Sequence, residues 1–155
     1  MKYTEIDNLF DKLWLICRSI TGPGITEFLK IIQDHVPIDI IEVPTGAKVF
    51  NWVVTPEWKL NKATLHTEDG ELIVSTKARN IHVLNFSQPF NGEVTYEELE
   101  QCIYSNTNLP EAIPYLTSYC ARRWGLCISD KQKLSLQRNK KYKVNIDTEI
   151  HSSNH

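Results

Sequence analysis

The sequence predicts an α+β fold that begins with a helix pair, continues with a central antiparallel β region, and ends with short helices and a strand. Three observations support this order. Between residues 5 and 36, apolar side chains recur every three or four positions, which is the period of an amphipathic helix. From residue 38 onward the period becomes that of strands rich in β-branched residues. After residue 94, two helix-capping patterns return.

The helix pair is predicted at residues 5–19 and 26–35. Residues 22–24 read Gly-Pro-Gly and separate the two helices, and Pro37 ends the second because its ring cannot continue a helix. The apolar stripe of the first helix, which we expect to face the core, is Ile6, Leu9, Phe10, Leu13, Trp14 and Cys17.

The central β region is predicted from alternation and turn chemistry. Asp69-Gly70 supplies the positive φ angles of a tight hairpin turn. His82 alternates with Ile81 and Val83, so we expect its ring to be exposed or at the edge of the core. The predicted strands are residues 38–40, 49–54, 64–67, 71–75 and 81–86.

Two capping boxes predict the late helices. Thr95 can accept a hydrogen bond from the amide of Glu98, whose carboxylate reaches back, and this helix is expected to run to about residue 104. Ser129 and Gln132 offer a second pair of the same kind.

The remaining C-terminal elements are predicted from a glycine that can end a helix and from alternating apolar residues. Residues 117–124 are expected to form a short helix closed by Gly125. Alternating apolar residues predict a strand over 142–150, and residues 151–155, which have no pattern, should fray.

Composition limits the class of protein. A chain of 155 residues with 41% hydrophobic and 23% charged residues suits one globular domain. The net charge of −2 and the pI near 6.2 exclude the broad attraction that nucleic acid or an anionic membrane requires. There is no run of about 18 apolar residues and no signal peptide pattern, so a cytoplasmic location is expected. The four scattered cysteines are expected to be reduced: Cys17, Cys102, Cys120 and Cys127.

No catalytic or metal-binding residue is predicted. The histidines include no His-Glu-x-x-His pattern, and they are His35, His66, His82, His151 and His155. Cys127 or Ser118 would need a histidine base in space, and no Gly-x-Ser-x-Gly elbow is present.

Polar and aromatic side chains close to turns form the candidate binding set. Such groups can line a substrate pocket. In the alternative interpretation, Arg18 and Arg122 pair with carboxylates while Tyr115 and Trp124 pack in the core. The candidates are Arg18, Thr21, Tyr115, Tyr119, Arg122 and Trp124.

Four stretches, in order, resemble the bacterial aminopeptidase-like proteins that are often encoded near surface-polysaccharide biosynthesis functions. They read LWLICRSITG at residues 13–22, EVPTGAKVFNWVVTPEW at 42–58, AIPYLTSY at 112–119 and WGLC at 124–127. The resemblance extends from about Leu13 to Ile150.

The resemblance implies a zinc-aminopeptidase-type α/β domain with a small β-rich insertion near its start and a winged-helix segment at its end. Residues 1–50 would begin the aminopeptidase-like domain and 51–110 would form the insertion. Residues 111–150 would return into the aminopeptidase-like sheet, and 151–155 would be a frayed tail.

The family's Cys-His-Pro and Asn-Asn-Glu stretches, which the resemblance implies as metal ligands, do not occur in this sequence. We therefore expect a truncated, non-catalytic N-terminal portion of a zinc-dependent aminopeptidase-like protein, with no cofactor of its own. Expected partners are a separately encoded catalytic half or a second copy. The alternative hypothesis is a stand-alone peptide- or glycan-binding module that presents Phe50, Trp52 and Trp58.

Overall fold

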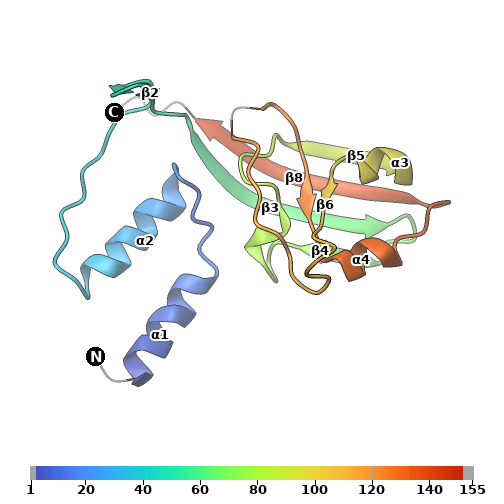
Figure 1. Ribbon diagram of the computed structural model, residues 1–155, viewed down its shortest axis with the longest axis horizontal. Coiled ribbons are helices and arrows are strands. Elements are labelled where there is room, and N and C mark those ends of the chain that lie inside the picture. The colour runs from blue at the N-terminus through green and yellow to red at the C-terminus, as the bar shows by residue number, and fades with distance from the viewer. Residues whose placement is uncertain (1–2, 120, 152–155) are drawn as a thin grey trace. The chain divides into compact units, whose positions relative to one another are not determined.

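The computed structural model describes residues 3–119 and 121–151, which fold into two compact units. The first unit contains the chain up to Lys59 together with the residues from Ile150 onward, and the second runs from Leu60 to Glu149. Helices and antiparallel sheets are combined in one chain, as the predicted α+β class requires (Figure 1). The domain boundaries expected after residues 50 and 110 stay a prediction.

The helix pair of the first unit is present, with shifted ends. Helix α1 spans Tyr3–Trp14, so it ends five residues earlier than the predicted residue 19. Helix α2 spans Pro23–Gln33 and begins earlier than predicted, because proline is well tolerated in the first turn of a helix.

Two predicted strands of the first unit are wrong. Residues 38–40 are not in a strand, and residues 49–54 form a hairpin instead of one strand. Its arms are β1 (Lys48–Val49) and β2 (Trp52–Val53), which pair antiparallel. The chain reverses at Phe50, whose φ of 55° is rare for a bulky residue. Val49 and Val53 do lie in strands, as their β-branched side chains favour, but the turn at Phe50 and Asn51 divides the stretch into two arms.

The second unit is built on a four-stranded sheet with the order β4-β3-β8-β5. The predicted hairpin is confirmed, because Leu65 of β3 pairs with Val74 of β4 and Gly70 has a φ of 93° in the turn. The predicted last strand is also confirmed, and His151 belongs to it, whereas residues 152–155 lie outside the described part. The strands are β3 (Glu57–Thr67), β4 (Leu72–Ser75), β5 (Phe90–Thr95) and β8 (Lys141–His151).

Smaller elements cover this sheet and complete the core. Both predicted capping boxes are confirmed, at Thr95 and at Ser129. These elements are α3 (Tyr96–Glu100), α4 (Asp130–Ser135), the 3₁₀ turn η1 (Asn80–His82) and the parallel pair β6 (Ile103–Tyr104) and β7 (Leu126–Cys127). Fully buried side chains in the core include Ala63, Leu65, Leu84, Leu99, Leu126, Cys127 and Ile128.

Helix α3 ends at Glu100, before the predicted residue 104, because Ile103 pairs with Leu126 in the parallel pair. The predicted strand over 81–86 and helix over 117–124 are wrong within the described residues. Their backbones bond to each other, since the amide of Asn85 donates to Leu116 (2.9 Å) and that of Ser118 donates to Asn85 (2.8 Å). A distant partner thus satisfies the polar groups that a local helix would otherwise have paired.

His82 is buried, with 5% of its surface exposed, so the predicted exposed or edge position is wrong. Its Nδ1 lies 2.8 Å from the carbonyl oxygen of Cys127, which can only accept, so Nδ1 carries the proton in the neutral ring. Burial lowers the pKa of His82 below its ordinary value. The fold therefore favours the uncharged imidazole.

This burial predicts an acid-sensitive stability. Because the folded-state pKa is depressed, the unfolded chain binds the proton first, and the contribution of His82 falls as pH drops below the ordinary histidine value of about 6.5. Urea unfolding at neutral and mildly acidic pH should show that the free energy of unfolding depends less on pH in His82→Gln than in the wild type. His66→Gln, at a half-exposed position, is the control and should keep the wild-type dependence. If the free energy of unfolding changed with pH in His82→Gln as it does in the wild type, His82 would not be the cause of the acid sensitivity.

Candidate functional site

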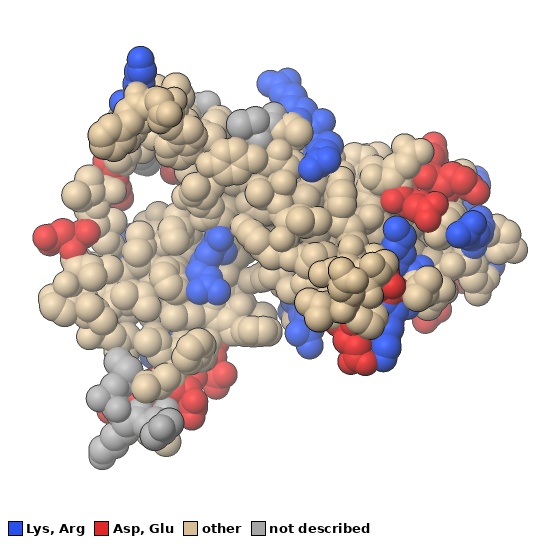
Figure 2. All heavy atoms as spheres, viewed as in Figure 1, with Lys and Arg blue, Asp and Glu red and all other residues tan. Residues whose placement is uncertain are grey.

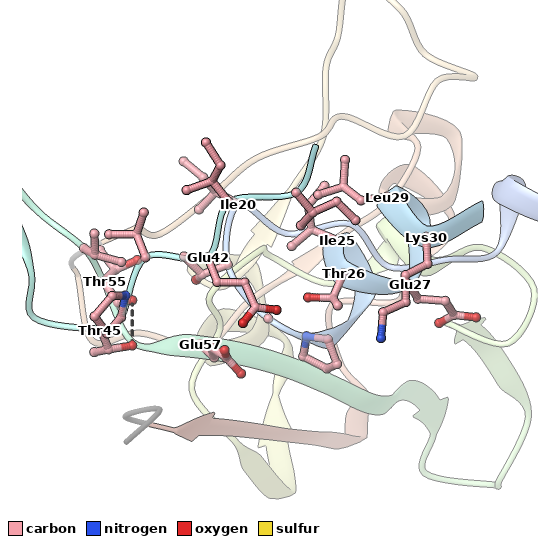
Figure 3. Close-up of a pocket in the computed structure, with 18 of the residues that line it drawn as sticks. Ile20, Ile25, Thr26, Glu27, Leu29, Lys30, Glu42, Thr45, Thr55 and Glu57 are labelled. Atoms are coloured by element: carbon pink, nitrogen blue, oxygen red, sulfur yellow. Dashed lines mark hydrogen bonds between the residues drawn. The ribbon is translucent and has the colours of Figure 1, made fainter. Parts of the chain in front are cut away.

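A pocket of about 1050 Å³ lies within the first unit, and we call it the α2 pocket (Figure 3). Its walls come from three segments that are distant in sequence, namely the loop and first turns of α2, residues 40–45 and residues 54–57. The lining side chains used below are Ile20, Thr21, Ile25, Glu27, Leu29, Lys30, Ile40, Glu42, Thr55 and Glu57.

Gly22 sets the entrance to α2. Its φ of 122° is favoured only by glycine, and an added Cβ would lie 2.3 Å from the carbonyl oxygen of Trp58. Gly24 meets a similar restriction, because a Cβ there would lie 2.0 Å from the carbonyl oxygen of Cys17. The Gly-Pro-Gly stretch therefore permits close backbone approach as well as breaking the helix.

Hydroxyl groups hold the same loop against residues 56–58. Thr21 Oγ1 donates to the carbonyl oxygen of Pro56 at 2.9 Å. Ser19 Oγ, which is buried, donates to the carbonyl oxygen of Thr21 and lies 3.4 Å from that of Trp58. These bonds fix the loop that forms one wall of the α2 pocket.

The pocket combines apolar and acidic surfaces. In Figure 3, Ile20, Ile25 and Leu29 lie along one side. Glu42 and Glu57 lie along the other. Such a mixture can hold a ligand that has an apolar body and a polar or charged end.

The structure separates the predicted site residues. Thr21 lines the α2 pocket, whereas Arg18 does not. The guanidinium of Arg18 lies over the ring of Phe28, 4.9 Å from its centroid. This contact is a cation–π interaction. Among the described residues, Arg18 therefore packs on an aromatic ring and does not form the predicted ion pair with a carboxylate.

The other four candidates, Tyr115, Tyr119, Arg122 and Trp124, belong to the second unit and do not line the α2 pocket. Trp124 stacks on Phe90 with ring centroids 4.3 Å apart, and the ring of Tyr119 lies 5.8 Å from that of Phe86. Tyr115 is 61% exposed, which contradicts a core role for it. A binding role for these four residues stays a prediction.

The pocket carboxylates were missed by sequence reasoning. Glu42 and Glu57 lie at the two ends of the stretch that carries the family resemblance, which is the only signal that could have drawn attention to them. Their convergence depends on the hairpin between them, which was predicted as a single strand.

Thiol chemistry finds no support in the described cysteines. Cys17, Cys102 and Cys127 are free, and Cys120 lies outside the described residues. Burial raises the pKa of Cys17 and of Cys127 to about 11, so both thiols stay protonated at neutral pH.

Within residues 3–119 and 121–151, no three histidine, cysteine, aspartate or glutamate side chains are grouped so that they could hold a metal ion. In the same part of the chain, every helix is too short or too polar to cross a bilayer.

Two comparisons place the chain among known proteins. A protein of Clostridium acetobutylicum, provisionally described as a polysaccharide biosynthesis protein with an aminopeptidase-like domain, is 37% identical over 94% of this chain. A crystal structure of a protein from the same organism, provisionally described as a peptidase, matches 96% of this chain with a TM-score of 0.88 and 36% identity. The chain spans only 33% and 35% of the lengths of these two proteins.

The family described as a domain of unknown function, DUF2172, matches residues 57–149, which include the sheet of the second unit. With the match over 60% of its length, the chain belongs to the DUF2172 family and is similar to the N-terminal part of proteins that carry an aminopeptidase-like domain.

Proposed function

We propose that this chain is a non-catalytic portion of a zinc-dependent aminopeptidase-like protein, which contributes to substrate binding while other residues hydrolyse the peptide bond. The observation that carries the proposal is the similarity of nearly the whole chain to about a third of an aminopeptidase-like relative. In this proposal, residues 1–50 and 111–150 belong to the aminopeptidase-like domain and 51–110 to its β-rich insertion.

The described residues do not fit a catalytic zinc site. Such a site needs about three histidine, cysteine or carboxylate ligands around one ion, with a position left for water. His82 is bound to a backbone carbonyl, His35 is exposed after α2, and His66 lies in β3 of the other unit. The zinc ligands are therefore proposed to come from the rest of the longer protein.

Exposed apolar side chains on α1 support a docking role for the first unit. Of the predicted apolar stripe, Leu13 is buried, whereas Phe10 is 68% exposed and Trp14 is 62% exposed. Leu15, directly after the helix, is 59% exposed. Contiguous apolar surface of this kind marks interaction sites in soluble proteins. We propose that the aminopeptidase-like remainder of the protein covers this surface.

Two of the three aromatic residues in the alternative binding-module hypothesis are exposed. Phe50 at the hairpin turn is 95% exposed and Trp52 is 38% exposed. Trp58, however, is 2% exposed, so its ring cannot stack on a sugar or peptide. This correction favours the aminopeptidase-like proposal over the binding module in its original form.

Catalysis by the chain alone is the first test. We expect no stoichiometric zinc by elemental analysis and no cleavage of an amino-acid anilide, because the described residues offer no metal-binding group. Bound zinc together with anilide cleavage that a chelator abolishes would overturn the proposal.

Docking is the second test. Sedimentation of the chain with the separately produced remainder of the Clostridium acetobutylicum relative should show a complex. The double variant Phe10→Ser/Trp14→Ser should weaken it by at least about tenfold, because each buried aromatic contributes about 1.5–3 kcal/mol. Leu134→Ser is the matched control, since Leu134 is 77% exposed on α4 of the second unit. A complex of the chain with itself would instead favour a second copy, the other partner expected from the sequence.

A further inference from the structure

We propose that a pocket beside η1 binds a small organic acid that also carries a hydroxyl group, with its carboxylate at Arg79 and its hydroxyl at His82. The pocket has a volume of about 330 Å³ and lies within the second unit, and we call it the η1 pocket. Such binding goes beyond the proposed function and does not rest on it. The lining side chains used below are Arg79, Ile81, His82, Glu111, Ile113 and Gln132.

A buried histidine with one unused ring nitrogen lines the η1 pocket. His82 is 5% exposed, and its Nδ1 donates to the carbonyl oxygen of Cys127 at 2.8 Å. Its Nε2 forms no hydrogen bond with the described residues. Among fully inaccessible side-chain nitrogen and oxygen atoms of those residues, only Thr55 Oγ1 lacks a partner, so Nε2 is not sealed off. Because His82 lines the pocket, Nε2 is open to it.

The hydrogen bond to Cys127 determines what Nε2 can bind. Nδ1 carries the proton of the neutral ring, so Nε2 holds a lone pair and can only accept. Burial lowers the pKa of His82 most, and the positive charge of Arg79 lowers it further, so the ring stays neutral. A bare carboxylate oxygen would face this lone pair without a proton between them. The ligand must therefore bring an O–H or N–H donor to Nε2.

Arg79 supplies a positive charge at the same pocket. Its side chain is exposed, and its guanidinium forms no ion pair or hydrogen bond with the described residues. It lies close enough to His82 for its charge to act on the ring. A guanidinium presents its donors in a planar fork that matches a carboxylate. The pocket thus places an anion-binding group beside an acceptor that needs a donor.

Other charged side chains of the second unit already have partners. Lys140 lies 2.6 Å from Glu68, and Figure 2 shows basic and acidic side chains close together on the face that it draws. Glu111, the carboxylate that lines the η1 pocket, forms an ion pair with Lys131. The acid of the lining therefore has a counterion, whereas the guanidinium of Arg79 is left for a ligand.

The rest of the lining suits a short hydroxylated molecule. Gln132 Nε2 lies 3.4 Å from the carbonyl oxygen of Ile73, so one of its N–H groups is available to a ligand hydroxyl. Ile81 and Ile113 are half-buried and can contact a carbon skeleton. The volume of about 330 Å³ is at the lower end of the range for small-molecule sites, which disfavours a long ligand.

A metal ion fits the η1 pocket poorly. A neutral imidazole nitrogen is a common metal ligand, but zinc needs about three protein ligands around one point. Nowhere in the described part of the chain do three histidine, cysteine or acidic side chains come together in this way. The guanidinium of Arg79 would also repel a cation from His82.

D-Gluconate tests the inference, with two matched probes of the same chain length. Sorbitol keeps the hydroxyls without the carboxylate, and hexanoate keeps the carboxylate without the hydroxyls. In nuclear magnetic resonance titrations of the whole chain, we expect gluconate to bind more tightly than either probe and to shift the amides of Ile81 and Ile113. The nitrogen resonance of His82 Nε2 should move with gluconate and stay unchanged with hexanoate.

Two variants separate the two halves of the site. Arg79→Gln should weaken gluconate by about fivefold or more and leave sorbitol unchanged, because a charge-assisted bond to the carboxylate is lost. Lys77→Gln, which removes an exposed cation nearby in sequence but outside the pocket, is the control and should bind as the wild type. His82→Asn keeps an amide that can donate to Cys127 but removes Nε2, so it should weaken gluconate by about threefold or more and leave hexanoate unchanged.

Binding of sorbitol or hexanoate as tight as that of gluconate would overturn the inference, as would an unmoved Nε2 resonance. Equal losses in Arg79→Gln and Lys77→Gln would also overturn it, because general charge attraction would then explain the binding. If His82→Asn does not fold, the Nε2 resonance of the wild type still decides the role of the histidine. Zinc content and anilide cleavage do not enter these titrations, so this result and that of the proposed function can fail separately.

Discussion

Replacing Gly22 by alanine is expected to unfold the loop and first turns of α2, with a loss of at least about 3 kcal/mol in the local stability of the first unit. The added Cβ would meet the carbonyl oxygen of Trp58 at 2.3 Å, and the φ of 122° is itself unfavourable for alanine. Backbone atoms on both sides must then shift, because neither is the end of a flexible side chain.

Amide hydrogen exchange is the appropriate measurement, because it reports the two compact units separately. Protection should fall across Pro23–Gln33 and stay unchanged in the sheet of the second unit. Gly46→Ala is the matched control, since Gly46 has a φ of 83° but nothing within 4 Å of its added Cβ. It should cost only about 1 kcal/mol. Equal losses in the two variants would show that the approach to Trp58 is unimportant.

Replacing Leu65 by alanine is expected to destabilise the second unit by about 2–5 kcal/mol. Leu65 is 0% exposed in β3, and its strand neighbour Val74 is 1% exposed, so the deleted atoms leave a cavity in a packed core. Urea unfolding followed by far-UV circular dichroism measures the loss.

Leu72→Ala provides the comparison on the partner strand. Leu72 lies in β4 and is 54% exposed, so its truncation should cost less than about 1 kcal/mol. A loss for Leu65→Ala as small as that for Leu72→Ala would mean that the sheet face carrying Leu65 is not the core.

Elements that depend on local chemistry could be predicted from the sequence. The capping boxes at Thr95 and Ser129 satisfy their own amides within four residues, and Gly70 supplies a turn that needs a positive φ. The alternation in β8 reports burial of one face directly. In each case the signal and the structure lie in the same short segment.

Elements that depend on distant partners could not be predicted from the sequence. Residues 116–118 pair with Asn85, more than thirty positions away, and no local sequence pattern indicates that pairing. The α2 pocket has the same difficulty, because three segments converge on it. Of the predicted site residues only Thr21 lines it, and the pocket carboxylates gave no periodic signal of their own.

Strand order has a consequence for synthesis of the chain. The last strand, β8, is inserted between β3 and β5 instead of being added at an edge. During synthesis, β3 and β5 therefore emerge from the ribosome well before β8. Until β8 follows, the backbone groups on the edges of β3 and β5 that pair with β8 have no hydrogen-bond partner in the sheet. The sheet can close only after residue 141 has left the exit tunnel, so premature termination before that point should yield aggregation-prone nascent chains in place of a smaller stable domain.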